Sequence, residues 1–313
     1  MGAFIVKRIL ATIPVMGVVA VTVFLLLHLS PGDPAAIIAG DFARPADVER
    51  IRERLGLDQP IYIQFLTWVG NMLQGDFGIS IFSNRPVTTL VAQRLEPTVA
   101  LAVATILVAI VIAVPMGVIA AWETNTWVDR TVMVFAVLGF SVPVFVVGYA
   151  LIYVVSLRLD LLPVQGYVSF REGLWPFISH LILPSFTLGI AYIALIARIT
   201  RASVLEVLTE DYIRTAHAKG LPERRVLVRH ALRNAAVPIV TVIGIGVALL
   251  IGGVVVTETV YNIPGLGRLV VDAILKRDYP IIQALIIMFS GVYVIINLVI
   301  DMLYTVLDPR IRY

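Results

Sequence analysis

The stretch Pro97-TVALAVATILVAIVIAVPMGVIA-Ala121 decides the fold class of this chain. It contains no Asp, Glu, Lys or Arg, and a helix needs roughly 20 apolar residues to cross the hydrocarbon core of a bilayer. Five further windows without these four residue types reach that length: Ile9–Leu29, Thr131–Leu157, Gly173–Ala197, Asn234–Thr257 and Tyr279–Ile300. The sequence therefore predicts an all-α, polytopic membrane protein with six transmembrane helices.

The composition of the whole chain supports this class. Of the 313 residues, 59% are hydrophobic and 14% are charged, whereas soluble domains are about half apolar and about a quarter charged. A soluble globule of this length cannot bury so many apolar side chains. The net charge of +3 is small. A small excess of basic residues in a membrane protein usually lies in its cytoplasmic loops and does not indicate nucleic-acid binding. The absence of cysteine excludes disulfides, thiolate metal sites and cysteine nucleophiles.

Lysine and arginine counts favour a cytoplasmic N-terminus. With that orientation the inside segments carry 13 of these residues and the outside segments carry 11, six of them in residues 30–96. Loops longer than about 60 residues cross the membrane largely regardless of charge, and discounting this segment leaves 13 against 5. Six spans then place both termini in the cytoplasm. The first window is too long for a signal-peptide core and lacks a small-residue cleavage site, so we interpret it as an uncleaved anchor.

Residues 30–96 contain a helical pattern of their own. Pro45 and the residues up to Leu55 predict a short helix that ends at Gly56, and Pro60 opens a second helix that ends at Gly75. Much of the second helix is apolar. Two interpretations stay open: a helical cap that lies on the outer membrane surface, and a docking surface for an external protein.

The segment Arg198–Arg233, cytoplasmic in this orientation, predicts two helices joined by a turn. Thr209 is a candidate N-cap with acidic residues after it, so a helix is expected over Glu210–Lys219, ending at Gly220. Pro222 then opens the second helix.

The two predicted helices differ in their side chains. The second carries Arg225, Arg229 and Arg233 at a spacing of four, and attraction to anionic lipid headgroups accounts for the last two. The first has mixed charges and small residues, among them Ala216 and Gly220 on one face. A short helix with such a face suits insertion into a groove on another protein.

Several kinds of chemistry are absent from the sequence. No G-x-x-x-x-G-K-[ST] phosphate loop occurs, so the chain itself is not expected to bind or hydrolyse ATP. The four histidines have no metal-ligand spacing, and no catalytic, cofactor or metal site is predicted. The six windows hold no ionisable residue except His28 and His180, whereas ion-coupled transporters usually bury charges in the membrane. A self-contained secondary transporter or channel is therefore the less favoured of two functions.

Several short sequence motifs are spread along most of the chain. They are Ser30-Pro-Gly-Asp-Pro34, Gly75-Asp-Phe-Gly78 with Arg85-Pro-Val87, Asp211-Tyr-Ile-Arg-Thr-Ala-His-Ala-Lys-Gly220-Leu221 with Glu223-Arg-Arg-Val226 and Arg229-His-Ala-Leu-Arg-Asn-Ala235, Thr257-Glu-Thr-Val-Tyr-Asn-Ile-Pro-Gly-Leu-Gly267, Arg277-Asp-Tyr-Pro280 and Leu307-Asp-Pro-Arg-Ile-Arg312. In this combination the chain resembles the permease subunits of dipeptide, oligopeptide and nickel ABC importers.

The resemblance implies a type I importer permease in the bacterial inner membrane. It implies a first helix with an extracytoplasmic helical segment over 1–94, a five-helix core over 95–308 with a coupling loop at 198–233, and a cytoplasmic tail over 309–313. The implied partners are a second permease, two cytoplasmic ATPases that hold ATP and Mg²⁺, an extracytoplasmic binding protein and the lipid bilayer, but no nucleic acid. The chain would carry no cofactor and would not be an enzyme. Close relatives handle dipeptides, longer peptides, glutathione and nickel chelates.

The resemblance also identifies site residues. The residues expected to couple to the ATPases are Asp211, Tyr212, Arg214, Thr215, Ala216, Lys219, Gly220 and Arg224. The candidate pathway residues are Ser141, Pro143 and Glu258. For Glu258, just beyond the fifth window, a place near the pathway and a role as an interfacial cap of that span stay equally open.

Overall fold

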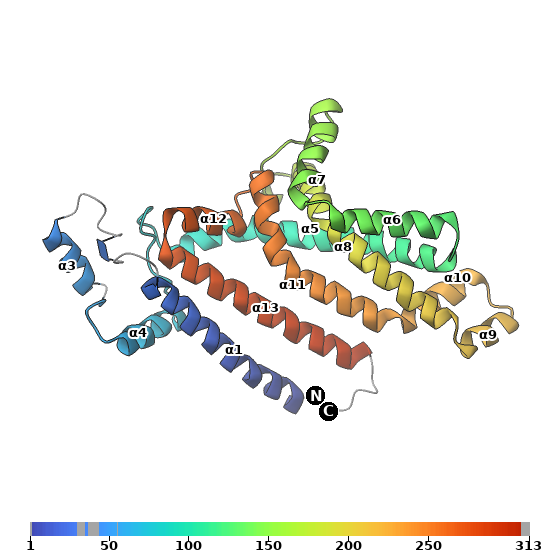
Figure 1. Ribbon diagram of the computed structural model, residues 1–313, viewed down its shortest axis with the longest axis horizontal. Helices are drawn as coiled ribbons and strands as arrows, with labels where there is room; N and C mark the ends of the chain where they lie inside the picture. The colour runs from blue at the N-terminus through green and yellow to red at the C-terminus, as the bar shows by residue number, and fades with distance from the viewer. Residues whose placement is uncertain (1, 30–34, 37–43, 55, 308–313) are drawn as a thin grey trace. The chain divides into compact units, whose positions relative to one another are not determined.

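The computed structural model describes residues 2–29, 35–36, 44–54 and 56–307 (Figure 1). Within these residues the chain is helical between its connections, and an isolated bridge joins Ile79 to Pro86. The predicted all-α class is therefore confirmed. The motif at 30–34 and the tail at 309–313 lie outside the described residues.

The helices follow one another along the chain in the order that Figure 1 labels. Their bounds are α1 Gly2–Leu29, α3 Pro45–Arg54, α4 Ile61–Leu73, α5 Val87–Trp122, α6 Trp127–Ser141, α7 Val144–Leu151 with a π-helical continuation Ile152–Arg158, a 3₁₀ turn Phe170–Glu172, α8 Leu174–Leu208, α9 Asp211–Ala218, α10 Glu223–Arg225 with a π-helical continuation Val226–Leu232, α11 Ala236–Val260, α12 Leu266–Lys276 and α13 Tyr279–Leu307.

In the part of the chain that the structure describes, four helices are each long and apolar enough to cross a membrane: α1, α5, α8 and α13. Two bent pairs raise the number to six if each pair is one span: α6 with α7, bent by 106°, and the helix 223–234 with the first half of α11, bent by 61°. The six predicted windows fall on these elements. The helices extend beyond the windows, however, and α8 continues past Ala197 to Leu208.

The described residues form two compact units, and each unit draws on separate parts of the sequence. The first contains the chain up to Arg94 together with Leu269–Val294, and the second contains Leu95–Arg268 and the residues from Ile295 onward. The sequence assigned 269–294 to the five-helix core. The predicted domain boundaries at residues 94 and 308 stay a prediction.

In the first unit, a buried polar contact joins two segments that lie far apart in the sequence. The Ser80 hydroxyl donates to one carboxylate oxygen of Asp278 over 2.6 Å, and the Ile81 amide donates to the other over 3.2 Å. Ser80 and Asp278 are each 2% exposed. This contact fixes the turn after Gly78 against the start of α13.

In the second unit, α8 is the central helix. Of its span window 61% is buried, compared with 22% for the window of α5. It packs against α6, α7 and α11. One buried cluster brings together Leu101 of α5, Leu188 of α8 and Val254 of α11.

Small residues allow α5 to approach α8 closely. A Cβ atom added to Gly117 of α5 would lie 2.6 Å from the Ala197 carbonyl oxygen and 2.6 Å from the Thr200 Cβ atom. Close approach of this kind is typical of helix pairs in membranes, where packing replaces the hydrophobic effect as the force between helices. Gly117 therefore sets the α5–α8 distance.

We expect Gly117→Val to destabilise the second unit, because the Ala197 carbonyl cannot move aside without disturbing α8. Overpacking of this kind typically costs about 1–3 kcal/mol. The matched control is Gly291→Val in α13, where an added Cβ atom meets no heavy atom within 4 Å. Thermal unfolding of the purified chain in detergent should show a lower Tm for Gly117→Val alone. Equal Tm values for the two variants would contradict the close packing.

Candidate partner-binding helix

The helix α9 is a short element between two longer ones. It follows α8 after only Thr209 and Glu210, and Glu210 is its N-cap residue with extended backbone. The prediction of Thr209 as the cap was wrong by one residue. Gly220 has φ +74°, which confirms that it ends the helix in a left-handed conformation. A turn at Gly220–Pro222 then leads into α10.

One face of α9 packs on this chain itself. Ile213 and Ala216 are 1% and 6% exposed and contact the buried Val226, with Val207 and Leu208 of α8 beside them. Ala216 was expected to approach a partner protein, whereas here it packs on its own chain; its part in coupling to the ATPases stays a prediction. The helical period decides the outcome: Ile213 and Ala216 are three apart and share the inner face.

The other predicted coupling residues are all exposed: Asp211, Tyr212, Arg214, Thr215, Lys219, Gly220 and Arg224. The face opposite Ile213 and Ala216 carries Asp211, Arg214, Thr215 and Ala218. Asp211 and Arg214 approach to 3.4 Å, but both side chains are largely in solvent, so the pair adds little to helix stability. Both charges therefore remain available to a partner.

The second predicted helix of this segment is irregular. After α10 the chain continues as a π-helical stretch, Val226–Leu232, in which hydrogen bonds join residues five apart. The expected four-residue arginine period does not hold through such a stretch. Arg225, Arg229 and Arg233 are nevertheless all exposed.

A buried ion pair that the sequence did not predict joins α6 to α8. Two guanidinium nitrogens of Arg201 donate to the two carboxylate oxygens of Asp129 over 2.5 and 2.7 Å. The backbone amide of Asn125 also donates to the Asp129 carboxylate, over 3.0 Å. The Asp129 side chain is 6% exposed and that of Arg201 is 22% exposed. A two-bonded pair of this type fixes both distance and orientation. It holds α6 to the end of α8 that leads into α9.

Each predicted span is defined as a run without Asp, Glu, Lys or Arg, so no predicted span can contain such an ion pair. The third window begins at Thr131 and the fourth ends at Ala197, so both charges fell outside the predicted spans. The only sequence signal is that each charge lies within four residues of a window end.

Glu258 does not face open space. It is 0% exposed in the last turn of α11, where it accepts hydrogen bonds from the Thr98 hydroxyl (2.6 Å) and the Arg268 amide (2.9 Å). A Cβ atom on Gly265 would overlap its carboxylate. The place of Glu258 near a pathway and its role as an interfacial cap both stay predictions. Glu258 ties the turn after α11 to α5.

The other two candidate pathway residues lie at the break between α6 and α7. Ser141 and Pro143 are both exposed, and the Ser141 hydroxyl donates back to the Val137 carbonyl over 2.9 Å. Pro143 has no N–H, so it cannot donate to the carbonyl of Gly139 as the next turn of a helix would require. This proline accounts for the bend between α6 and α7.

Two family models together match almost the whole chain. The model for the binding-protein-dependent transport system inner membrane component matches residues 113–313, and the model for the N-terminal part of such a membrane component matches residues 1–102.

Curated relatives match over their full length. The probable peptide ABC transporter permease protein y4tP of Sinorhizobium fredii is 55% identical over 313 residues, which is 100% of both chains. The glutathione transport system permease protein GsiC of Escherichia coli is 47% identical over 310 residues, which is 99% of both chains. Among solved structures, the MetNI methionine ABC transporter in inward-facing conformations matches with a TM-score of 0.59 and 17% identity, over 70% of this chain and 96% of that chain. This last likeness concerns the fold.

We expect Asp129→Leu alone to destabilise the second unit strongly, because it leaves the Arg201 charge buried without its partner. Removing one member of a buried pair typically costs about 3–5 kcal/mol, and the partial exposure of Arg201 favours the lower end. The double variant Asp129→Leu/Arg201→Met should be more stable than Asp129→Leu. Unfolding of the purified chain measures both. If the stability lost in the double variant equals the sum of the losses in Asp129→Leu and in Arg201→Met alone, the pair is not coupled.

Proposed function

We propose a transport function for this chain, which belongs to the family of binding-protein-dependent transport system inner membrane components. It is the permease subunit of an ABC importer, and it moves di- or oligopeptides or a related small solute such as glutathione across the membrane. The chain is not itself an enzyme, because ATP hydrolysis takes place in partner subunits.

The observation that carries this proposal is the exposed outer face of α9. Ten residues or fewer of helix are marginal in water, and α9 is stabilised on one side only, by Ile213 and Ala216. Its other side presents Asp211, Arg214 and Thr215 without cover from this chain. A cytoplasmic ATPase that docks on this face would complete the packing of α9.

The complete transporter contains two permeases, two cytoplasmic ATPases and an extracytoplasmic binding protein. The ATPases hold ATP and Mg²⁺, and this chain contributes no phosphate loop to them. The chain crosses the bacterial inner membrane six times with both termini in the cytoplasm. In this orientation α9 lies on the cytoplasmic side, where ATP is available.

The contacts around α9 define how a movement at an ATPase reaches the membrane. Ile213 and Ala216 pack against Leu208, so α9 moves with the end of α8. The Arg201–Asp129 pair joins the same end of α8 to α6. A shift of α9 is therefore passed to two spans at once, and the second unit rocks between inward- and outward-facing packings as a rigid body.

The break at Ser141–Pro143 supports a place on the transport pathway. Within a membrane, backbone groups without helical partners are tolerated where they are buried in protein or line a water-filled cavity. Ser141 and Pro143 are exposed in the single chain, and a pathway between the two permeases would provide that cavity.

The buried charges give no support to an ion-driven transporter. Asp129 is paired with Arg201, and Glu258 and Asp278 each accept hydrogen bonds from fixed donors. A coupling ion would have to displace these partners.

The function is tested by reconstitution. Proteoliposomes with the two permeases, the ATPases and the cognate binding protein should accumulate labelled dipeptide, tripeptide or glutathione only when ATP is present and this chain is included. Equilibrium dialysis of the binding protein against these solutes and a nickel chelate identifies the substrate. Uptake that continues without the ATPases would favour a secondary transporter.

We expect Ala218→Trp on the outer face of α9 to weaken ATPase binding, because the added ring forces the two surfaces apart. A cost of about 1–3 kcal/mol lowers affinity by roughly one to two orders of magnitude. Co-purification of the ATPases with the two permeases measures this loss.

Two comparisons make the result specific. Leu174→Trp at the opposite end of α8 is exposed to 60% and should leave the complex intact. Ala216→Trp should instead lower the Tm of the permease itself, since Ala216 packs on its own chain. Full ATPase occupancy and normal transport by Ala218→Trp would show that α9 is not the docking element.

The orientation is tested in this cysteine-free chain by single cysteines. Asp58→Cys, exposed in the segment between α3 and α4, should react with a membrane-impermeant thiol reagent added to intact cells with a permeable outer membrane. Glu123→Cys, exposed between α5 and α6, should react only after the inner membrane is disrupted. The reverse pattern would invert the topology.

A further inference from the structure

The helix α4 has an unusual composition for a connecting helix. Its sequence, IYIQFLTWVGNML, contains no charged residue, and none of its residues is buried. With 13 residues it is too short to span a bilayer, which needs about 20.

The side chains of α4 divide by helical period into an apolar stripe and a polar face. Tyr62, Leu66, Val69 and Leu73 recur at intervals of three and four residues and form the stripe. Leu66 is 65% exposed and Leu73 is 84% exposed. The described residues of this chain therefore leave most of the stripe uncovered.

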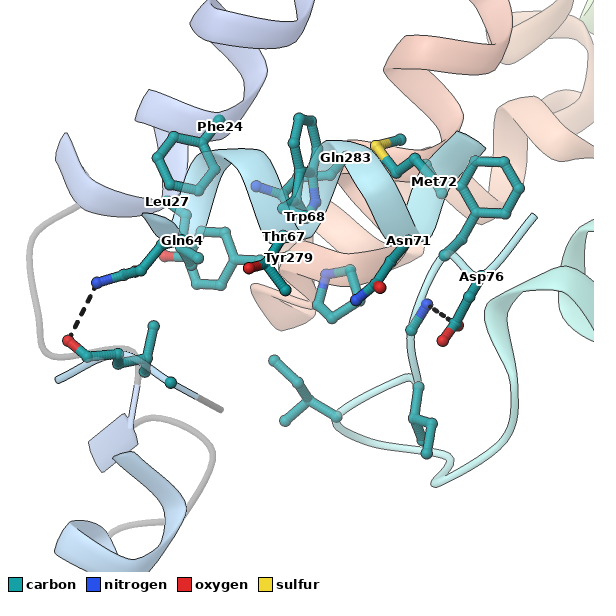
Figure 2. Close-up of a pocket in the computed structure, with 18 of the residues that line it drawn as sticks. Phe24, Leu27, Gln64, Thr67, Trp68, Asn71, Met72, Asp76, Tyr279 and Gln283 are labelled. Atoms are coloured by element: carbon teal, nitrogen blue, oxygen red, sulfur yellow. Dashed lines mark hydrogen bonds between the residues drawn. The ribbon is translucent and has the colours of Figure 1, made fainter. Parts of the chain in front are cut away.

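The opposite side of α4 is polar and borders a pocket of about 600 Å³ in the first unit (Figure 2). Gln64, Thr67 and Asn71 line this pocket from α4, and Tyr279 and Gln283 line it from α13. The Gln64 side-chain amide donates to the carbonyls of Leu57 and Gln59 over 3.2 and 2.8 Å. Hydrogen bonds therefore hold the polar side of α4 toward the connection before it.

Aromatic contacts fix the depth of α4 along α1. The Phe24 ring of α1 lies 5.3 Å from that of Phe65 and 5.7 Å from that of Trp68, between ring centroids. Phe24 is five residues before the end of α1 at Leu29, which is about 7.5 Å along the axis at 1.5 Å per residue. Residues 9–29 of α1 already span about 31 Å, the thickness of the hydrocarbon core. The contact with α4 therefore lies near the edge of that core.

Polar and aromatic contacts with α1 also indicate which side of α4 points away from the membrane centre. The Gln64 amide oxygen lies 3.1 Å from a ring nitrogen of His28, whereas Phe65 and Trp68 contact Phe24, one turn nearer the membrane centre. The polar side of α4 therefore faces away from the membrane centre.

We propose that α4 lies in the interface of the bilayer at the Leu29 end of α1, with its apolar stripe among the lipid acyl chains. Lipid is favoured over a protein because α4 packs on α1, a helix long and apolar enough to cross a membrane, on which Val18 is 68% exposed and Leu29 is 77% exposed. A helix without charges also offers a protein partner no complementary charge, while short amphipathic helices of this kind bind membrane interfaces. The proposal does not depend on the transport function.

The test uses nitroxide labels on single cysteines in the assembled transporter in lipid nanodiscs. The substitutions are Leu66→Cys and Leu73→Cys on the stripe, with Asn71→Cys on the polar face as the matched control. Power-saturation spectroscopy measures collisions with oxygen, which concentrates in lipid, and with a water-soluble nickel chelate. The ratio of oxygen to nickel collisions should be several-fold higher at both stripe positions than at Asn71.

Three results would overturn the proposal. Equal ratios at the three positions, or a higher ratio at Asn71, would place the stripe in water. Protection of the stripe labels from both reagents would show that a protein covers it. A second measurement uses bimane on the same cysteines, which brominated lipids should quench at Leu66 and Leu73 and not at Asn71. A Tm equal to that of the parent chain verifies that each labelled variant is folded.

Discussion

Hydrocarbon offers a peptide group no hydrogen-bond partner, and the architecture of this chain depends on that constraint. Each crossing satisfies its own backbone as a helix, so helices can associate only through side-chain packing and a few polar contacts. The close approach at Gly117 and the Arg201–Asp129 pair are the two forms that this association takes around α8. The exception is Ser141–Pro143, where the helical bonding is interrupted and the chain bends between α6 and α7.

The presence and helical type of the membrane elements could be predicted because a charge-free run is a property of the sequence alone. The lengths of the helices could not. A helix continues as long as its backbone bonds are satisfied, and an ion pair such as Asp129–Arg201 can be buried beyond the apolar run. The partner that neutralises Asp129 is 72 residues away, and only the fold brings the two together.

The same distinction separates what was right from what was wrong about α9. A glycine followed closely by a proline predicts a turn from local backbone preferences, and Gly220 has the expected conformation. The direction in which Ala216 points depends on Val226 and Leu208, which belong to neighbouring elements. Small size alone made Ala216 equally suited to a contact within the chain and to a contact with a partner. Glu258 is a similar case, since Thr98 and Arg268 decide whether its carboxylate is satisfied.

The contact between Ser80 and Asp278 has a consequence for biosynthesis. The two residues are 198 positions apart, and a ribosome adding about 5–20 residues per second needs roughly 10–40 s to make the second after the first. During that interval the nascent chain has α1, α4 and the turn after Gly78 but lacks the carboxylate that fixes the turn. Most of the second unit is synthesised in the meantime. The N-terminal unit is therefore completed late, and a chaperone or insertase that protects its unfinished polar groups would have to remain until α13 emerges.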